Sequence, residues 1–304
     1  MRPHRAAGQN FLINTGTLQC IVDAVHPQPE DTILEIGAGF GVLTEALAPA
    51  AGRVVAVERD HRIVPLLRER IAQYANVIVV EADILDILSS PHTPPHVVIS
   101  SDAIPPPVIS SDAASEKSHT PHTTLRFLLS QHNIGTRKIV ANLPYSITSD
   151  FLRVLFDRVA DGTLSPPERV VLLLQYEVVE RLIGRTERQR GLPTMLTELA
   201  CGSIRRVARV PGTHFWPAPK VQSAVAVFSA WRSPEEIAAL VESGREHLIA
   251  VMKQGFAHPR RQLVNTLHGT SDAVWTRAGV APSSRPAMLT LHQWIALANA
   301  IAAP

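Results

Sequence analysis

The four residues from Asn142 to Tyr145 carry the side chains of this sequence that are best suited to chemistry. They read Asn-Leu-Pro-Tyr and follow the apolar run 138–141. The amide oxygen of Asn142 and the backbone carbonyl of Pro144 can together accept both hydrogens of an exocyclic amine, which aims the nitrogen lone pair at an electrophile. We expect the Pro144 carbonyl to be free, and Tyr145 offers a ring on which a base can stack. A strand that ends in an ordinary turn explains the same four residues equally well.

A glycine-rich turn upstream predicts a nucleotide site. The apolar run 32–36 is typical of a buried strand, and Gly37, Gly39 and Gly41 follow it before a helical pattern begins at Val42. Strand, glycine turn and helix form the opening of a doubly wound sheet. A dinucleotide fingerprint needs Gly or Ala where this chain has Val42. The Glu-x-Gly-x-Gly-x-Gly spacing instead resembles the S-adenosylmethionine loop of methyltransferases.

Acidic residues stand at the ends of the next two predicted strands. The strand 53–57 ends at Glu58, about 20 residues after the first glycine, where a carboxylate accepts from ribose hydroxyls. The strand 77–80 leads to Asp83, which can accept from the adenine amine of a cofactor, and to Ile84, which can pack against its ring. Each carboxylate alone is more often a solvated strand end. Together with the glycine loop and the Asn-Leu-Pro-Tyr turn, they indicate one site.

The chain resembles the ribosomal RNA adenine N6,N6-dimethyltransferases over nearly its whole length. The resemblance rests on the glycine loop and on residues 8–12, Glu58, 82–83, 142–145, 175–182, 215–224, 256–263 and 285–286. The Pro-x-Pro-Lys-Val-x-Ser-Ala stretch at 217–224 is more specific than a glycine-rich loop. It favours the branch that acts on the small ribosomal subunit over the antibiotic-resistance branch that acts on large-subunit RNA.

This resemblance implies a fold and an activity. The fold is α/β, a Rossmann-like methyltransferase domain over residues 1–231, followed by a small α-helical RNA-docking domain over 232–304. The activity is transfer of methyl groups from S-adenosylmethionine to N6 of two adjacent adenosines in the 3′-terminal hairpin loop of small-subunit (16S) ribosomal RNA, during ribosome biogenesis. The partner is therefore the immature small subunit or its RNA, and the protein is expected to act as a monomer.

The resemblance also implies roles for single residues. The candidate catalytic residues are Asn142, Pro144, Tyr145 and Phe215. The candidate cofactor-binding residues are Asn10, Leu12, Gly37, Gly39, Gly41, Glu58, Asp83, Ile84 and Asn142. Phe215 is expected to face Tyr145, so that the two rings clamp an adenine that has left its stack. An apolar anchor for its own loop is the other interpretation of Phe215.

Residues 88–137 depart from the family pattern. This Ser/Pro/His-rich insertion holds an imperfect repeat, 98–103 and 108–113, and cannot sustain a core, so we expect a mobile surface loop with a short helix over 124–132. Five histidines lie in it, namely His92, His96, His119, His122 and His132. Their spacing is too loose to favour a metal site, and none is expected. A role as a lid over the cofactor stays open.

Composition sets further bounds. A chain of 304 residues that is 45% hydrophobic and 18% charged can bury an α/β core and one smaller domain. Cys20 and Cys201 lack metal-ligand spacing and are interpreted as core residues in a reducing compartment. No run reaches transmembrane length and no signal sequence is present, so we expect a cytoplasmic protein. The net charge of +2 is weak evidence for RNA binding. Arginine clusters at 205–209 and 260–261 are better evidence, since they suit phosphate contacts.

Hydrophobic periodicity predicts the remaining elements. Strands are expected at 32–36, 53–57, 77–80, 138–141, 169–174 and 221–228. Helices are expected at 14–25, 150–159, 177–183, 192–200, from 233 onward, at 261–267 and at 291–301. Three other functions stay open at this stage: the same chemistry on large-subunit RNA, an RNA-binding assembly factor with little turnover, and a DNA or protein methyltransferase.

Overall fold

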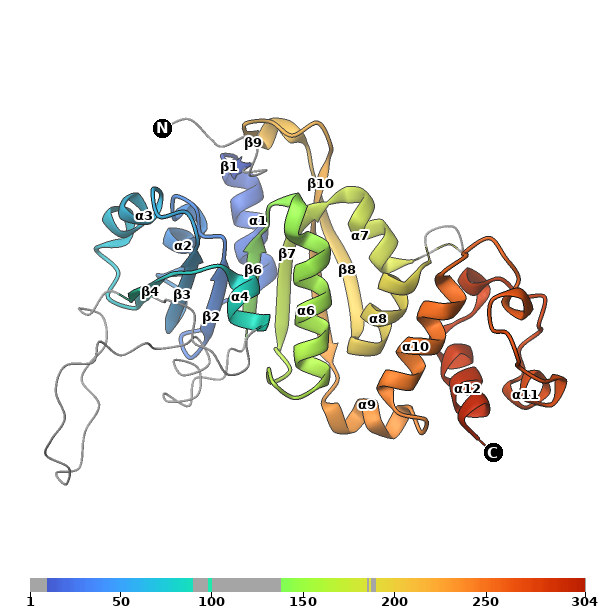
Figure 1. The fold of residues 1–304 in the computed structure, drawn as a ribbon. Coiled ribbons are helices and arrows are strands. Elements are labelled where there is room, and N and C mark those ends of the chain that lie inside the picture. Colours follow the sequence, from blue (N-terminus) through green and yellow to red (C-terminus); the bar gives the residue numbers. More distant parts are fainter. Residues whose placement is uncertain (1–9, 90–97, 100–137, 185, 187–189, 304) are drawn as a thin grey trace, which may run out of the picture.

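An eight-stranded sheet forms the centre of the protein (Figure 1). The computed structural model describes residues 10–89, 98–99, 138–184, 186 and 190–303. In spatial order the strands are β5 (Val98–Ile99), β4 (Val77–Glu81), β3 (Arg53–Glu58), β2 (Thr32–Ile36), β6 (Lys138–Asn142), β7 (Arg169–Gln175), β10 (Ser223–Trp231) and β8 (Cys201–Val210). The five strands from β4 to β7 are parallel, whereas β5, β10 and β8 pair antiparallel with their neighbours. This is the expected α/β methyltransferase-like sheet.

Helices cover both faces of the sheet, because its central strands are apolar on both sides. One face packs on α1 (Thr15–Val25), α2 (Val42–Leu47) and α3 (Val64–Ile71). The other face packs on α4 (Ile84–Ser89), α6 (Thr148–Ala160), α7 (Tyr176–Ile183) and α8 (Leu192–Ala200). Alternate residues of one strand serve the two cores, as Ile33 and Leu34 of β2 show.

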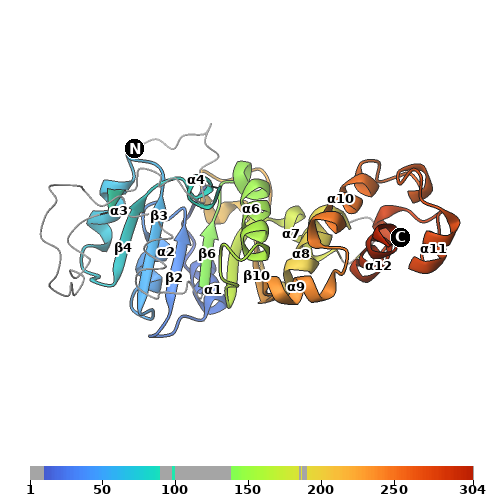
Figure 2. The same cartoon turned by 60° about the horizontal axis from the view of Figure 1, so that its bottom comes forward.

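The C-terminal helices have a core of their own and lie at the end of the molecule remote from β4 (Figure 2). They are α9 (Pro234–Leu240), α10 (Arg245–Phe256), α11 (Asp272–Ala278) and α12 (Leu291–Ala302). Trp294 and Trp275 are buried at the centre of this core, which also takes in Met195 and Leu199 of α8. Leu196 packs against this core and against the core of the sheet. Helix α8 therefore belongs to both parts.

Several elements differ from those predicted. Strand β8 was missed, because only its ends, Cys201 and Val210, are buried and an edge strand needs no apolar run. The predicted strand 221–228 is β10, shifted to 223–231. The predicted helix 261–267 is wrong, since only a single 3₁₀ turn, Leu263–Asn265, forms there. Within the insertion, Val98–Ile99 pairs with β4 rather than forming loop, and the predicted helix 124–132 lies outside the described residues.

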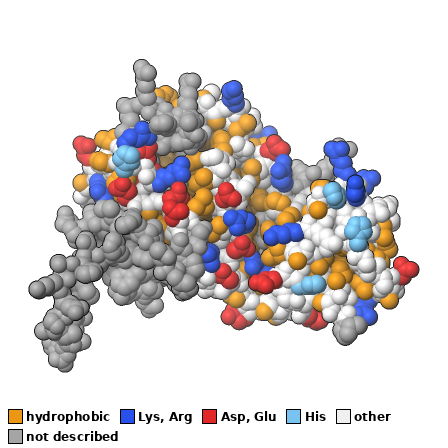
Figure 3. All heavy atoms as spheres, in the orientation of Figure 1, with side chains coloured by type: hydrophobic (Ala, Val, Ile, Leu, Met, Phe, Trp, Pro, Cys, Tyr) orange, Lys and Arg blue, Asp and Glu red, His pale blue; other side chains and the backbone are white. Residues whose placement is uncertain are grey.

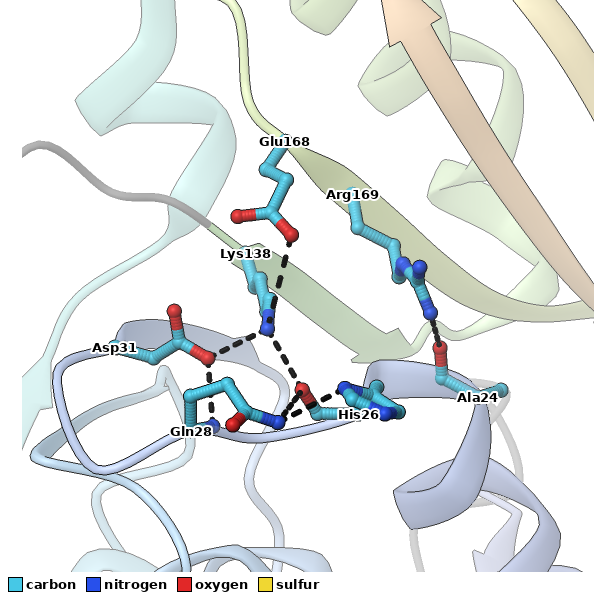
Figure 4. Close-up of polar contacts among 7 residues, drawn as sticks. All are labelled: Ala24, His26, Gln28, Asp31, Lys138, Glu168 and Arg169. Atoms are coloured by element: carbon cyan, nitrogen blue, oxygen red, sulfur yellow. Dashed lines mark hydrogen bonds and ion pairs between the residues drawn. The ribbon is translucent and has the colours of Figure 1, made fainter.

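A buried ion pair holds the amino ends of the central strands together (Figure 4). Lys138, the first residue of β6, is only 2% exposed. Its Nζ donates to Asp31 Oδ2 at 2.6 Å and to the His26 carbonyl at 2.7 Å. Asp31 directly precedes β2 and His26 ends α1, so one ammonium group joins three elements. Because a charge buried without a partner is costly, these contacts select the pairing of β6 with β2.

We predict that Lys138→Met lowers the free energy of unfolding by about 3–5 kcal/mol, because it leaves the Asp31 carboxylate buried without its cation. Urea unfolding followed by circular dichroism measures the effect. The control is Arg70→Met, which breaks a half-exposed pair with Glu45 and should cost less than about 1 kcal/mol. Equal losses in the two variants would contradict the structural role of Lys138.

Candidate functional site

A pocket opens at the carboxyl ends of β2, β3, β4 and β6, the edge at which ligands bind in open α/β sheets. Of the predicted cofactor residues, the pocket is lined by Asn10, Leu12, Gly37, Gly39, Glu58, Asp83, Ile84 and Asn142. It is also lined by Pro144 of the predicted catalytic group, but not by Gly41, Tyr145 or Phe215. Residues 132 positions apart in the chain therefore meet in one cavity, as the hydrogen bond between Asn10 and Asn142 illustrates.

The glycine loop needs its glycines for two different reasons. Gly39 has a φ of +55° and points its N–H at Glu58, with a hydrogen bond of 2.8 Å to Oε2. Gly41 has a φ of +79°, and a Cβ there would lie 2.7 Å from Leu67 Cδ1 of α3. Gly41 thus allows the loop to pack on α3, whereas Gly37 and Gly39 line the pocket.

Glu58 holds the loop in place as well as facing the pocket. Its Oε2 accepts from the Gly39 N–H, and its Oε1 accepts from the Asp60 N–H, both at 2.8 Å. The residue is 7% exposed. Each carboxylate oxygen has a second lone pair, so the group can still accept from a pair of hydroxyls while it fixes the loop.

Asp83 is more constrained than the sequence suggested. Its Oδ1 accepts from the Leu85 N–H at 2.9 Å, at the start of α4, and its Oδ2 pairs with Arg59 Nη1 at 3.0 Å. Arg59 also lines the pocket and was missed, because no pattern distinguishes it from other surface arginines. An amine that binds Asp83 must therefore share this carboxylate with Arg59.

The turn after β6 differs from its prediction in one respect. Asn142 Nδ2 donates to the Asn10 carbonyl at 3.2 Å, an assignment that leaves Oδ1 as the acceptor for another ligand. The Pro144 carbonyl is not free as expected, because it accepts from the Ile147 N–H at 3.1 Å and so begins the 3₁₀ turn Tyr145–Ile147. Thr148 Oγ1 also donates to this carbonyl, at 3.5 Å, so a ligand amine that binds there has to displace this long contact or share the oxygen with it.

The two aromatic residues of the predicted clamp lie outside the pocket lining. The Tyr145 hydroxyl and Ser223 Oγ are 2.6 Å apart, and burial raises the pKa of this phenol, an effect that the Ser223 hydrogen bond partly offsets. Phe215 is 3% exposed and packs in the core on the α1–α3 face of the sheet. Its ring has almost no free surface in this conformation.

A two-stranded ribbon joins the N-terminal segment to the Phe215 segment. Strand β1 (Phe11–Leu12) pairs antiparallel with β9 (Phe215–Trp216), with Leu12 opposite Phe215. The Phe11 ring lies 4.6 Å from the Phe40 ring of the glycine loop, centroid to centroid. Leu12, on the pocket side, and Phe215 are thus held in register.

Glu35 is a second polar residue of the pocket that sequence reasoning did not use. It is 2% exposed in the middle of β2 and lines the pocket. Burial raises the pKa of its carboxyl to about 8; Thr44 opposes this rise, and the Glu58 carboxylate adds to it. Its place as the first residue of Glu-x-Gly-x-Gly-x-Gly was the available signal.

The described residues contain no group of three or more His, Cys, Asp or Glu side chains arranged to hold a metal ion. The five histidines of the insertion lie outside that part of the chain. No helix within the described ranges is long and apolar enough to cross a membrane. Cys20 is partly buried and Cys201 is buried, and both are free thiols.

Known proteins resemble this chain over its full length. The family described as ribosomal RNA adenine dimethylase matches residues 2–303. The chain is 32% identical to the ribosomal RNA small subunit methyltransferase A of Dehalococcoides mccartyi. The match covers 97% of this chain and 87% of the relative. It is 33% identical to the protein of the same name from Geobacter sulfurreducens, over 100% of this chain and 96% of the relative.

Solved structures share the fold. A dimethyladenosine transferase from Plasmodium falciparum superposes with a TM-score of 0.63 at 20% identity, covering 94% of this chain and 95% of that one. The 23S rRNA methyltransferase ErmE superposes with a TM-score of 0.62 at 24% identity, covering 96% of this chain and 99% of that one. The family match spans the sheet, the pocket and the C-terminal helices alike. This chain is therefore a member of the ribosomal RNA adenine dimethylase family.

Proposed function

We propose that this enzyme transfers methyl groups from S-adenosylmethionine to N6 of two adjacent adenosines in the 3′-terminal hairpin loop of small-subunit ribosomal RNA. The observation that carries the proposal is the meeting of Asn142 and the glycine loop in one pocket. The names of the relatives, which specify the small subunit, favour this RNA over the large-subunit RNA named for ErmE.

The polar and apolar groups that line the pocket fit S-adenosylmethionine. Glu58 suits the ribose hydroxyls, Asp83 and Ile84 suit the adenine, and the positive φ of Gly37 and Gly39 lets backbone approach a ligand closely. Asn10 and Leu12 close the pocket from the N-terminal side. When bound, the cofactor supplies an electrophilic methyl group on a sulfonium centre.

The turn after β6 then orients the acceptor amine. Asn142 Oδ1 and the Pro144 carbonyl accept the two N6 hydrogens, which localises the nitrogen lone pair. At the carbonyl the amine takes the place of the long Thr148 hydroxyl contact. No general base is needed, because the nitrogen proton becomes acidic once the nitrogen has been alkylated. In this proposal Tyr145 and Phe215 stack on the flipped base. Because Phe215 is covered, the clamp also requires the β9 segment to shift.

The helical domain 232–304 is proposed to dock the RNA. Figure 3 shows Lys and Arg side chains gathered at the upper end of this domain, where the chain leaves α10. Lys253 of α10 and the two arginines shortly after this helix, Arg260 and Arg261, are exposed. By contrast, Arg206 and Arg209 of β8 lie 5.1 and 4.2 Å from the Tyr176 ring centroid, and both donate to its hydroxyl. Tyr176 thus holds two cations in place.

The proposal is tested with labelled S-adenosylmethionine and immature small subunits, followed by RNA digestion and separation of nucleosides. Dimethyladenosine at adjacent positions near the 3′ end of small-subunit RNA supports it. Label found only in large-subunit RNA, offered in parallel, contradicts the substrate, and RNA binding without label contradicts the activity. We propose that the protein works as a monomer in the cytoplasm, where this substrate is assembled.

We predict that Asn142→Ala lowers the rate of methyl transfer by about 100-fold or more, because the amine loses an acceptor that orients it. Cofactor affinity should change little, so calorimetry of cofactor binding separates the two effects. Gln73→Ala, at an exposed amide in the turn that follows α3, is the control and should retain full activity. Wild-type turnover in Asn142→Ala would refute the assignment.

We also predict that replacing Arg260 and Arg261 together by Ala weakens binding to small-subunit RNA. The slope of log K against log salt concentration should fall by about 2, since two phosphate contacts are lost. Filter binding at several salt concentrations measures the slope. The control is the joint replacement of Arg62 and Arg70, which are exposed and paired with acidic residues at the other end of the molecule. This replacement should leave the salt slope unchanged.

A further inference from the structure

Two arginines of the edge strand β8, Arg206 and Arg209, lie on the same face of the sheet although they are three residues apart. In a regular strand, residues three apart point to opposite faces. The register of β8 on β10 shifts between Arg206 and Ala208, which leaves Val207 without a partner. This β-bulge turns both arginines toward α7, and bulges of this kind often re-aim side chains next to active sites.

The same register places Arg205 on the other face of the sheet. Arg205 lies opposite Val227, which packs in the core on the α1–α3 side. Arg209 lies opposite Ala224, which packs in the core on the α7 side. Directly opposite residues of paired strands share a face. The arginine cluster predicted at 205–209 is therefore divided, with two cations at α7 and the third across the sheet from them.

The two arginines at α7 differ in how their charges are balanced. Arg206 forms an ion pair with Glu180 of α7. The neighbouring carboxylate on this helix, Glu177, pairs with Arg181 at 3.0 Å. Within the part of the chain that the structure describes, no carboxylate pairs with Arg209, which is exposed. One positive charge is thus left unbalanced at Arg209.

Tyr176, the first residue of α7, holds the Arg209 side chain in one orientation. The guanidinium carbon of Arg209 lies 4.2 Å from the centre of the Tyr176 ring, and its Nη2 donates to the Tyr176 hydroxyl. The ring covers one face of the guanidinium, and the hydroxyl takes one of its five N–H donors. The remaining donors lie in a plane that suits two oxygens of a phosphate. A cation fixed in advance also loses less conformational freedom when it binds.

This cation lies at the edge of the sheet that carries the reactive turn. Strands β6, β7 and β8 end at this edge, and β10 begins there. Ser223 Oγ of β10 is 2.6 Å from the Tyr145 hydroxyl, and the next residue, Ala224, lies opposite Arg209. Three strand spacings of about 4.8 Å separate β6 from β8, so the backbones of Asn142 and Arg209 are about 14 Å apart along the edge.

We propose that Arg209, oriented by Tyr176, binds a backbone phosphate of the RNA strand a few nucleotides from the target adenosine. This inference rests on the proposed function, since it takes RNA as the substrate. A base that is flipped into the pocket leaves the neighbouring phosphates outside, along the same edge of the sheet. With a rise of about 3.4 Å per stacked nucleotide, the separation of the two residues corresponds to a few nucleotides. Arg209 thereby helps to set which adenosine reaches Asn142, and Tyr176 is a positioning residue that acts through Arg209.

The test measures RNA binding and methyl transfer with the full-length protein. Filter binding of small-subunit RNA at several salt concentrations gives the steepness of log K against log salt concentration. In Arg209→Ala this steepness should fall by about 1, because one phosphate contact is lost. With immature small subunits as substrate, KM should rise by about tenfold or more while kcat stays the same. Arg205→Ala, on the same strand but on the opposite face, is the matched control and should leave both measurements unchanged.

Two further variants test the orientation of the cation. Tyr176→Leu keeps the charge of Arg209 but removes its support, so it should raise KM less than Arg209→Ala does. In an Arg209→Ala background the Tyr176→Leu change should add nothing, because the two residues act as one unit. Arg209→Lys should restore the salt dependence and only part of the affinity, since an ammonium group cannot present two donors in one plane.

The inference is overturned if Arg209→Ala shows the salt dependence and the KM of wild type. Arg209 would then only protect the edge of the sheet, as charged side chains of edge strands do. Equal effects in Arg205→Ala would overturn it as well, because they would indicate a general effect of net charge. Both outcomes leave the proposed function standing. Failure of the wild-type protein to bind or methylate small-subunit RNA would contradict the proposed function itself.

Discussion

The parallel pairing of β2 with β6 is the constraint on which the site depends. Ile36 lies opposite Ala141, so the next residues, Gly37 and Asn142, emerge side by side at the same edge of the sheet. A Cβ on Gly37 would lie only 3.5 Å from the Asn142 carbonyl oxygen. The glycine loop and the Asn-Leu-Pro-Tyr turn are more than 90 residues apart in the chain, and this register alone makes them neighbours. At the opposite ends of the strands, the Lys138–Asp31 pair secures the same register with a single buried ion pair.

Much of this arrangement could be predicted from the sequence, because its signals are local and repeated. Apolar runs identified the central strands, and the residues just after them identified most of the pocket. Other features depend on tertiary contacts. The Pro144 carbonyl is occupied because the chain turns into a 3₁₀ helix at once, and Arg59 matters only because Asp83 lies across from it. Glu35 begins the Glu-x-Gly-x-Gly-x-Gly pattern, but the pattern does not show that its carboxyl is buried.

The pocket is built with an excess of negative charge. Glu35, Glu58 and Asp83 line it, and Arg59 is the cation that accompanies them in the lining. Glu58 and Asp83 are each stabilised by backbone N–H groups, so their charges belong to the architecture of the loop and of α4. Glu35 is the most deeply buried of the three, and burial raises the pKa of its carboxyl to about 8 although Thr44 of α2 opposes the rise. The three carboxyls thus divide into two that position the backbone and one whose negative charge is disfavoured by burial.

Helix α8 has a mechanical consequence beyond the two cores it completes. Because Leu196 packs against both, and Met195 and Leu199 are buried among the C-terminal helices, bending between sheet and helices would open both cores at once. The Arg245–Asp157 ion pair between α10 and α6 reinforces the same joint. The packing therefore holds the C-terminal helices and the pocket at the edge of the sheet at a fixed separation. Under the proposed docking of RNA on the helical domain, only nucleotides at that distance from the docked part reach the pocket, so geometry as well as base identity would select the target.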